Sequence, residues 1–151
     1  INTSSVANSL FSDFDINDLN MEKKFTPNKA YGNAKLENIL FTKELDSLYG
    51  PKGVSAVAFH PGNVATNFAS EAKGLFRFIY HSPLKKLFRL ITPAQGADTM
   101  IWLATTAPGK DWVTGEYYVK RKIAKASDKA YDPALASSLW RQSATMTHIN
   151  K

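Results

Sequence analysis

A long helix is the clearest element in the pattern of apolar and polar positions along the chain. Thr26 and Pro27 are typical of a helix N-cap and first turn, and Gly50 followed by Pro51 predicts an end on a left-handed residue before a helix breaker. Apolar side chains recur every three or four residues between these ends, so the helix is expected to be covered on more than one side. The expected buried stripe consists of Ala30, Ala34, Phe41, Leu45 and Leu48, widened by Ile39 and Leu40.

A short buried strand follows this helix. Val54 to Phe59 is an apolar run without strict alternation, which is typical of a parallel strand covered on both faces. A helix followed by such a strand is half of a right-handed crossover unit. The pattern therefore predicts an α/β sheet rather than a helical bundle.

Weaker patterns predict elements on either side of this unit. Residues 6–25 mix aspartates with alternating apolar side chains and predict an ordered loop or a short hairpin. Residues 92–95 have the sequence of a capping box and start a second helix, which Pro108 and Gly109 stop. The expected buried face of that helix is Ala97, Met100, Ile101 and Ala104.

The C-terminal part predicts one more strand and one more helix. Gly115 to Val119 is expected to be the last strand, and Asp132 and Pro133 start the final helix. Core spacing in that helix is shown by Leu135, Ala136, Leu139 and Trp140.

Residues 67–91 form an amphipathic segment rich in aromatic and basic side chains. This composition fits a lid over a lipophilic substrate, a helix lying on an anionic membrane surface, or a flap that packs over the core. All three remain open at this point.

Composition indicates one soluble globular domain over residues 1–151. The chain is 44% hydrophobic and 21% charged, and at 151 residues it is long enough for a real core. No stretch reaches the roughly 18 apolar residues of a membrane span, and the start lacks a signal-peptide pattern. The absence of cysteine excludes disulfides and thiolate metal sites, and we predict no metal site.

The net charge of +6 permits weak attraction to phosphates or anionic lipid. A basic run at residues 120–125 is expected to be a solvated surface, because no nucleic-acid-binding motif or second basic stripe accompanies it. We therefore predict no nucleic-acid partner. The absence of cysteine fits a reducing compartment, and we expect an intracellular location, either cytoplasmic or on a membrane surface.

Tyr31 and Lys35 are the strongest candidates for chemistry. Residues four apart on a helix share a face, so the phenol and the ammonium are expected to point into one cleft. A tyrosine, whose pKa is ordinarily about 10, exchanges protons poorly near neutral pH unless a nearby cation stabilises the phenolate. Ser4 and Ser5 follow an apparent strand end and can bring a hydroxyl to the same cleft, an arrangement suited to proton transfer to a carbonyl oxygen.

Three motifs resemble the short-chain dehydrogenase/reductase family in order and spacing, with the closest likeness to its retinol-dehydrogenase-like branch. They are Asn-Thr-Ser-Ser at residues 2–5, Tyr-Gly-Asn-Ala-Lys at 31–35 with the helix that continues to Leu45, and Phe-His-Pro-Gly-Asn-Val-Ala-Thr at 59–66. The resemblance extends from residue 1 to about residue 119. It implies the C-terminal half of a Rossmann-like doubly wound parallel sheet in three α/β/α layers.

The resemblance also implies site residues. Tyr31, Lys35 and Ser5 would be catalytic, with Ser5 preferred to Ser4, and residues 67–91 would be the substrate lid. Cofactor-binding residues would be Tyr31, Lys35, Pro61, Gly62, Val64 and Thr66, with NAD or NADP as the cofactor. His60 is interpreted as a structural turn residue, and the small residues beside Tyr31 would leave room for a flat cofactor.

None of the eight glycines forms the clustered strand-to-helix loop that cradles a dinucleotide pyrophosphate. Together with the start inside a strand end, this predicts the C-terminal portion of a longer chain, which we expect to be inactive in isolation.

The expected function is an NAD(P)-dependent oxidoreductase that interconverts a carbonyl and an alcohol, acting on a small lipophilic molecule. The alternative is a non-catalytic interaction or membrane-surface module that keeps the same fold, with residues 75–91 as its contact.

Overall fold

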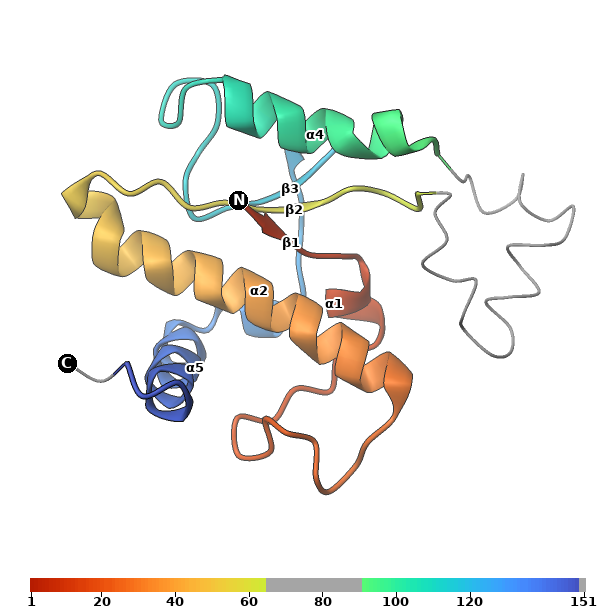
Figure 1. Ribbon diagram of the computed structural model, residues 1–151, viewed down its shortest axis with the longest axis vertical. Coiled ribbons are helices and arrows are strands. Elements are labelled where there is room, and N and C mark those ends of the chain that lie inside the picture. The colour runs from red at the N-terminus through yellow and green to blue at the C-terminus, as the bar shows by residue number, and fades with distance from the viewer. Residues whose placement is uncertain (65–90, 150–151) are drawn as a thin grey trace, which may run out of the picture.

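The computed structural model describes residues 1–64 and 91–149, and Figure 1 shows their arrangement. The order of elements is β1 (Asn2–Thr3), α1 (Ala7–Leu10), α2 (Pro27–Tyr49), the 3-10 turn η1 (Gly50–Lys52), β2 (Ala58–His60), α4 (Pro93–Thr105), β3 (Tyr117–Val119), β4 (Lys122–Ile123), the 3-10 turn η4 (Asp128–Tyr131) and α5 (Pro133–Met146). The predicted segment at 67–91 lies outside the described residues except for Ile91.

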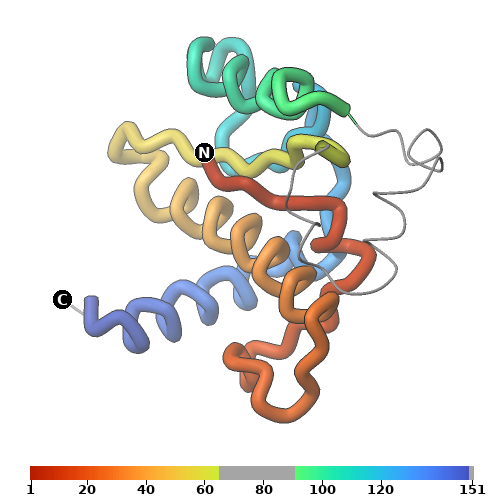
Figure 2. The backbone as a smooth tube through the Cα atoms, turned by 45° about the vertical axis from the view of Figure 1, so that its right-hand side comes forward, coloured from red at the N-terminus to blue at the C-terminus, as the bar shows by residue number. Residues whose placement is uncertain are grey.

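The strands form one mixed sheet in the order β1-β2-β3-β4. β2 lies parallel to both neighbours, with Asn2 opposite Ala58 and Phe59 opposite Tyr118, whereas β4 runs antiparallel to β3. Helix α4 lies on one side of the sheet, and α2 and α5 lie on the other (Figures 1 and 2). The predicted α/β architecture, a partial doubly wound Rossmann-like sheet, is confirmed.

Each face of the sheet carries its own hydrophobic core. Ala58 and Tyr117 belong to the larger cluster, which α2 and α5 cover with Leu36, Ile39, Leu40 and Leu139. Their neighbours along the strands belong to the second cluster, whose members are Val57, Phe59, Leu103, Trp112 and Tyr118. Successive residues of β2 and β3 thus point to opposite covered faces, which explains why the apolar run before His60 does not alternate.

The predicted helix starts are confirmed. Thr26 Oγ1 accepts a hydrogen bond from the Lys29 amide, and Thr92 forms a complete capping box with Gln95. Asp132 caps α5 by accepting from two first-turn amides, at 2.9 and 3.1 Å. These local bonds satisfy amides that have no partner inside the helix.

The expected buried stripe of α2 is only partly right. Ile39 and Leu40 are buried as predicted and Ala30 and Leu45 are half-buried, but Ala34, Phe41 and Leu48 are exposed. The other buried positions, which were not predicted, are Gly32, Asn33, Leu36 and Thr42. The face that a helix buries depends on what packs against it, and here the segment around α1 covers Gly32 and Asn33. Phe41 instead stacks on Trp140 of α5, with ring centroids 5.2 Å apart.

The end of α2 also differs from the prediction. Gly50 has φ −53° and is right-handed, because Pro51 fits the first turn of η1 and the chain continues for one 3-10 turn. The left-handed residue is Gly53, with φ +88°.

Three further expectations need correction. The hairpin alternative for residues 6–25 is wrong, since this segment contains α1 and turns. Helix α4 buries Gly96, Thr99 and Leu103, while the predicted Met100 and Ile101 are 41% and 54% exposed, so its buried face is rotated. The strand predicted as the last is followed by β4.

Candidate active site

A cavity of about 710 Å³ lies beside the carboxyl ends of β1 and β2, at the edge where open α/β sheets bind ligands. Its lining includes these predicted site residues: Ser5, Tyr31, Lys35, Pro61, Gly62 and Val64. Thr66, the other predicted residue, lies outside the described ranges.

Helix α2 brings Tyr31 and Lys35 to this cavity from adjacent turns. Lys35 Nζ lies 5.5 Å from the centroid of the Tyr31 ring and donates a hydrogen bond of 3.2 Å to the Thr3 carbonyl oxygen. Both side chains are partly exposed. The arrangement places a positive charge beside a phenol at the wall of an open cavity.

The two serines have different environments. Ser4 is 1% exposed, and its hydroxyl donates to the Lys35 carbonyl oxygen at 2.7 Å. Ser5 is half-buried, and its Oγ accepts a hydrogen bond of 3.3 Å from the Ala7 amide. This contact leaves the Ser5 proton available, whereas the Ser4 proton is already engaged.

Polar side chains along α2 tie this helix to β1. Asn38 Nδ2 donates to the Thr3 carbonyl oxygen at 3.0 Å, and Asn2 Nδ2 donates to Thr42 Oγ1 at 2.9 Å. The position of Lys35 relative to the end of β1 is therefore fixed over two turns of helix. Sequence reasoning missed Asn38 and Thr42, although their place among apolar positions of the helix was a signal.

His60 is the last residue of β2 and is 7% exposed. Burial lowers its pKa from the ordinary value of 6.5, and its Nδ1 has no hydrogen-bond partner among the described residues. His60 also lines the cavity, and its burial at the strand end fits its interpretation as a structural residue.

The loop after His60 packs against the start of α4. Gly62 has φ +93°, and a Cβ there would come within 2.6 Å of Ile91 Cδ1. Val64 pairs with Ile91 across an isolated bridge and contacts Gly96. Close packing against Ile91 therefore explains why glycine occupies position 62, and its approach to a cofactor stays a prediction.

Sequence reasoning missed several residues that line the cavity. Most belong to the segment around α1 and to one face of α4: Val6, Ala7, Phe11, Asn28, Pro93, Gly96, Ala97 and Met100. Only the folded chain shows that these elements border one space, because nothing in their local pattern distinguishes them from packing residues.

Two absences hold for the part of the chain that the structure describes. No group of three or more His, Asp or Glu side chains there could hold a metal ion. No helix within residues 1–64 or 91–149 combines the length and apolarity needed to cross a bilayer.

The fold and the cavity define a partial doubly wound α/β protein with an open cavity at the carboxyl edge of its sheet. Similar proteins specify the class further. The chain is 36% identical to human retinol dehydrogenase 14 over 149 aligned residues. The alignment covers 93% of this chain and 42% of that protein. It is 32% identical to a short-chain dehydrogenase/reductase of Aspergillus calidoustus, over 84% of this chain and 42% of that one.

Two further comparisons agree. Human polyprenol dehydrogenase is 31% identical over 97% of this chain and 44% of its own length. A crystal structure of an uncharacterized protein from Mycobacterium paratuberculosis superposes with a TM-score of 0.67 and 26% identity, covering 97% of this chain and 48% of that one. No protein-family model matches.

The chain belongs to the short-chain dehydrogenase/reductase family, and its relatives include retinol dehydrogenases. It spans about 42% of the length of the first relatives that it matches.

Proposed function

We propose that the whole protein is an NAD(P)-dependent oxidoreductase that interconverts a carbonyl and an alcohol, with Ser5, Tyr31 and Lys35 as its catalytic residues. The observation that carries this proposal is their meeting at one cavity. Its relatives are oxidoreductases, which supports the class of reaction.

In this proposal Tyr31 is the general acid in reduction and the general base in oxidation. In reduction its hydroxyl gives a proton to the substrate oxygen, and in oxidation its phenolate takes the proton back. The Lys35 ammonium, 5.5 Å from the ring centroid, favours the phenolate electrostatically. Ser5 donates a hydrogen bond that holds the substrate oxygen near Tyr31.

In this proposal the cavity holds the nicotinamide end of the cofactor. We expect Lys35 and Tyr31 to bind the ribose hydroxyls, and the loop of residues 61–64, which lines the same cavity, to bind the carboxamide. When bound, this cofactor supplies the hydride in reduction and accepts it in oxidation. The pyrophosphate would need a glycine-rich loop that these 151 residues lack, so we expect the isolated chain to bind cofactor weakly, which a fluorescence titration would test.

The substrate is expected to be a lipophilic alcohol or carbonyl compound. Val6, Ala7, Phe11 and Met100 give the cavity an apolar wall, and transfer of an apolar substrate body to such a wall is favourable. Retinol dehydrogenase and polyprenol dehydrogenase, by their names, act on molecules of this kind.

Replacement of Tyr31 by Phe in the complete protein tests the proposal. Tyr31→Phe removes the hydroxyl and keeps the ring, so turnover should fall by at least about 100-fold while cofactor binding stays within roughly twofold. Tyr49→Phe is the matched control, because Tyr49 lies on the same helix outside the cavity. Turnover retained in Tyr31→Phe would remove Tyr31 from the mechanism.

A further inference from the structure

One wall of the cavity is a short segment that precedes helix α2 in the chain, residues 6–12, here called the wall segment. Val6, Ala7 and Phe11 of this segment line the same cavity as Tyr31. Val6 and Phe11 are 40% and 36% exposed, so apolar side chains remain open for contact. The wall segment therefore contributes a surface suited to the apolar part of a ligand.

The wall segment lies against α2 at a point where only glycine fits. A Cβ on Gly32 would come within 2.6 Å of the Ser12 amide nitrogen and 2.7 Å of the Phe11 carbonyl carbon. Both atoms belong to main chain, which cannot turn aside as a flexible side chain can. Gly32 thus serves this close approach.

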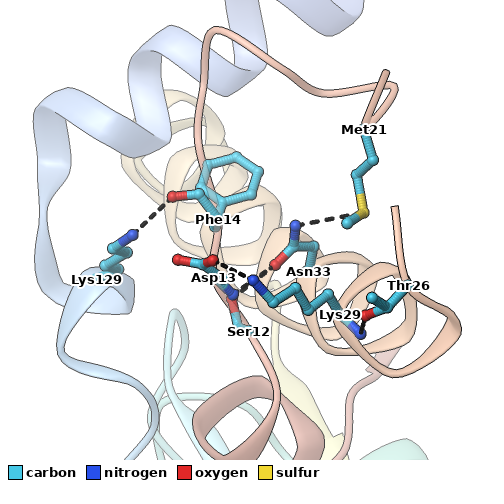
Figure 3. A network of polar contacts seen from close by, with 8 residues as sticks. All are labelled: Ser12, Asp13, Phe14, Met21, Thr26, Lys29, Asn33 and Lys129. Atoms are coloured by element: carbon cyan, nitrogen blue, oxygen red, sulfur yellow. Dashed lines mark hydrogen bonds and ion pairs between the residues drawn. The ribbon is translucent and has the colours of Figure 1, made fainter. Parts of the chain in front are cut away.

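Asn33, the next residue, bonds the same stretch of chain. Asn33 is 6% exposed, and its Oδ1 accepts hydrogen bonds of 3.0 Å from Ser12 Oγ and from the Asp13 amide. Its Nδ2 lies 3.6 Å from Met21 Sδ, so both ends of the carboxamide have partners (Figure 3). A buried amide with these contacts fixes the main chain directly after Phe11.

Two lysines hold the following residues from opposite sides. Lys29 of α2 pairs with Asp13 at 2.5 Å, and Lys129 of η4 donates to the Phe14 carbonyl oxygen at 2.6 Å (Figure 3). Asn8 inside the wall segment is 1% exposed and accepts from the Ser127 amide at 2.8 Å. The wall segment is consequently anchored at Asn8 and Ser12, and the chain is held again directly after it at Asp13 and Phe14.

The order of residues on α2 links this anchoring to the chemistry. Tyr31 lines the cavity. Directly after it, Gly32 lies against the main chain of Phe11 and Ser12, and Asn33 accepts hydrogen bonds from the Ser12 hydroxyl and the Asp13 amide. A helix is rigid over three residues, so the distance between the phenol and the wall is set by α2 itself. A substrate oxygen placed at Tyr31 would have its apolar body placed against Phe11.

We propose that Phe11 is a specificity-determining residue that selects substrates by the length of the apolar body, which it contacts beyond the first few carbons from the reacting carbon. Gly32 and Asn33 are the positioning residues that keep Phe11 in register with Tyr31. This inference rests on the proposed oxidoreductase function and adds to it which side chains recognise the substrate body.

The test uses a series of unbranched aldehydes from butanal to dodecanal, with the complete protein and reduced cofactor. Phe11→Ala removes ring contact with the long aldehydes only, so kcat/KM for dodecanal should fall about tenfold while that for butanal changes less than about twofold. Leu10→Ala is the matched control, because Leu10 is 68% exposed and does not line the cavity. A ratio of the two kcat/KM values that is the same in wild type and Phe11→Ala overturns the inference.

The positioning residues are tested by a double-mutant cycle. Asn33→Ala alone should lower the same ratio, mainly by raising KM for dodecanal, and should have little further effect when Phe11 is already alanine. If Asn33→Ala acted only by a general loss of folding, kcat/KM would fall equally for both aldehydes, and the loss would add to that of Phe11→Ala. This outcome would remove Asn33 from the positioning role.

A glycine pair provides an independent check. Gly32→Ala pushes on the main chain of the wall segment and should lower the dodecanal-to-butanal ratio of kcat/KM. Gly50→Ala meets only the Asp46 carboxyl group, at 3.4 and 3.7 Å, and should leave that ratio unchanged. An unchanged ratio in a folded Gly32→Ala protein would contradict the role of Gly32. If the wild-type protein reduces no aldehyde or ketone at all, the proposed function fails. If it reduces them and Phe11→Ala has the same dodecanal-to-butanal ratio of kcat/KM as wild type, only the role of Phe11 fails.

Discussion

Lys35 and Ser4 hold each other in place at the end of β1. The Ser4 hydroxyl donates to the Lys35 carbonyl oxygen at 2.7 Å, and Lys35 Nζ donates at 3.2 Å to the carbonyl oxygen of Thr3, the residue before Ser4. The main chain and the ammonium group of Lys35 are thus both hydrogen-bonded to the C-terminal end of β1 and the residue after it. The ammonium keeps a fixed place relative to Ser5, the next residue along, which is the arrangement that the proposed proton transfer needs.

Replacement of each serine by alanine should separate their roles. Ser4→Ala removes a buried hydrogen bond and should lower the free energy of unfolding by about 1 kcal/mol. Ser5→Ala should leave stability within about 0.5 kcal/mol and lower kcat of the complete protein by at least about tenfold. Urea unfolding and steady-state kinetics measure the two effects. If Ser4→Ala lost turnover at unchanged stability, the assignment of the two serines would have to be exchanged.

Loss of the Lys35 ammonium should remove catalysis while the fold persists. Lys35→Met keeps an unbranched apolar stem but neither the charge beside Tyr31 nor the bond to Thr3, so kcat should fall by roughly 100-fold or more. Lys43→Met is the control, since Lys43 lies on the same helix, 3.9 Å from Glu116, outside the cavity. Equal kcat in the two variants would argue against an electrostatic role for Lys35.

Local signals in the sequence were sufficient for the helix starts and for the pairing of Tyr31 with Lys35. An N-cap such as Thr26 or Asp132 acts within its own first turn, so its bonds depend only on nearby residues. The spacing of four likewise places two side chains on one face wherever the helix lies. The cavity that these side chains share depends on the whole fold.

Features decided by distant contacts could not be predicted. The buried face of α2 is centred on Leu36 and includes polar Asn33 because of what packs there, and Phe41 of the apolar stripe lies at the surface against Trp140. The role of Gly32 also appears only in the fold, since its neighbours are Phe11 and Ser12 of another segment. Hydrophobic periodicity contains no information about such neighbours.

The β3–β4 hairpin was missed because its turn lacks the usual residues. Val119 pairs with Lys122, and the two residues between them, Lys120 and Arg121, have φ of +50° and +59°. Two-residue turns with both φ values positive normally carry asparagine or glycine. Arg121 is held in this left-handed conformation by its ion pair with Asp98 and by a hydrogen bond of 3.3 Å from its amide to Thr99 Oγ1.

Relief of strain at this turn should stabilise the protein. Lys120→Asn places a residue that tolerates left-handed backbone at the first turn position and keeps the Arg121 ion pair, so the free energy of unfolding should rise by about 0.5 to 1 kcal/mol. Lys122→Asn, in β4, is the control and should give no such gain. Thermal and urea unfolding of the two variants provide the comparison. A Lys120→Asn protein no more stable than wild type would show that the turn is not strained.

His60 should make stability depend on pH near neutrality. Burial lowers its folded pKa below the ordinary 6.5, so the unfolded chain binds a proton at a pH where the folded chain does not. The resulting stability is present above pH 6.5 and is lost as pH falls through the lower, folded pKa. His60→Gln cannot titrate, and between pH 7.5 and pH 5 its free energy of unfolding should therefore decrease less than that of wild type. His148→Gln, at an exposed position, is the control and should keep the wild-type slope. Urea unfolding at both pH values measures the slopes, and parallel profiles for wild type and His60→Gln would mean that the imidazole is solvated at acidic pH rather than enclosed at the end of β2.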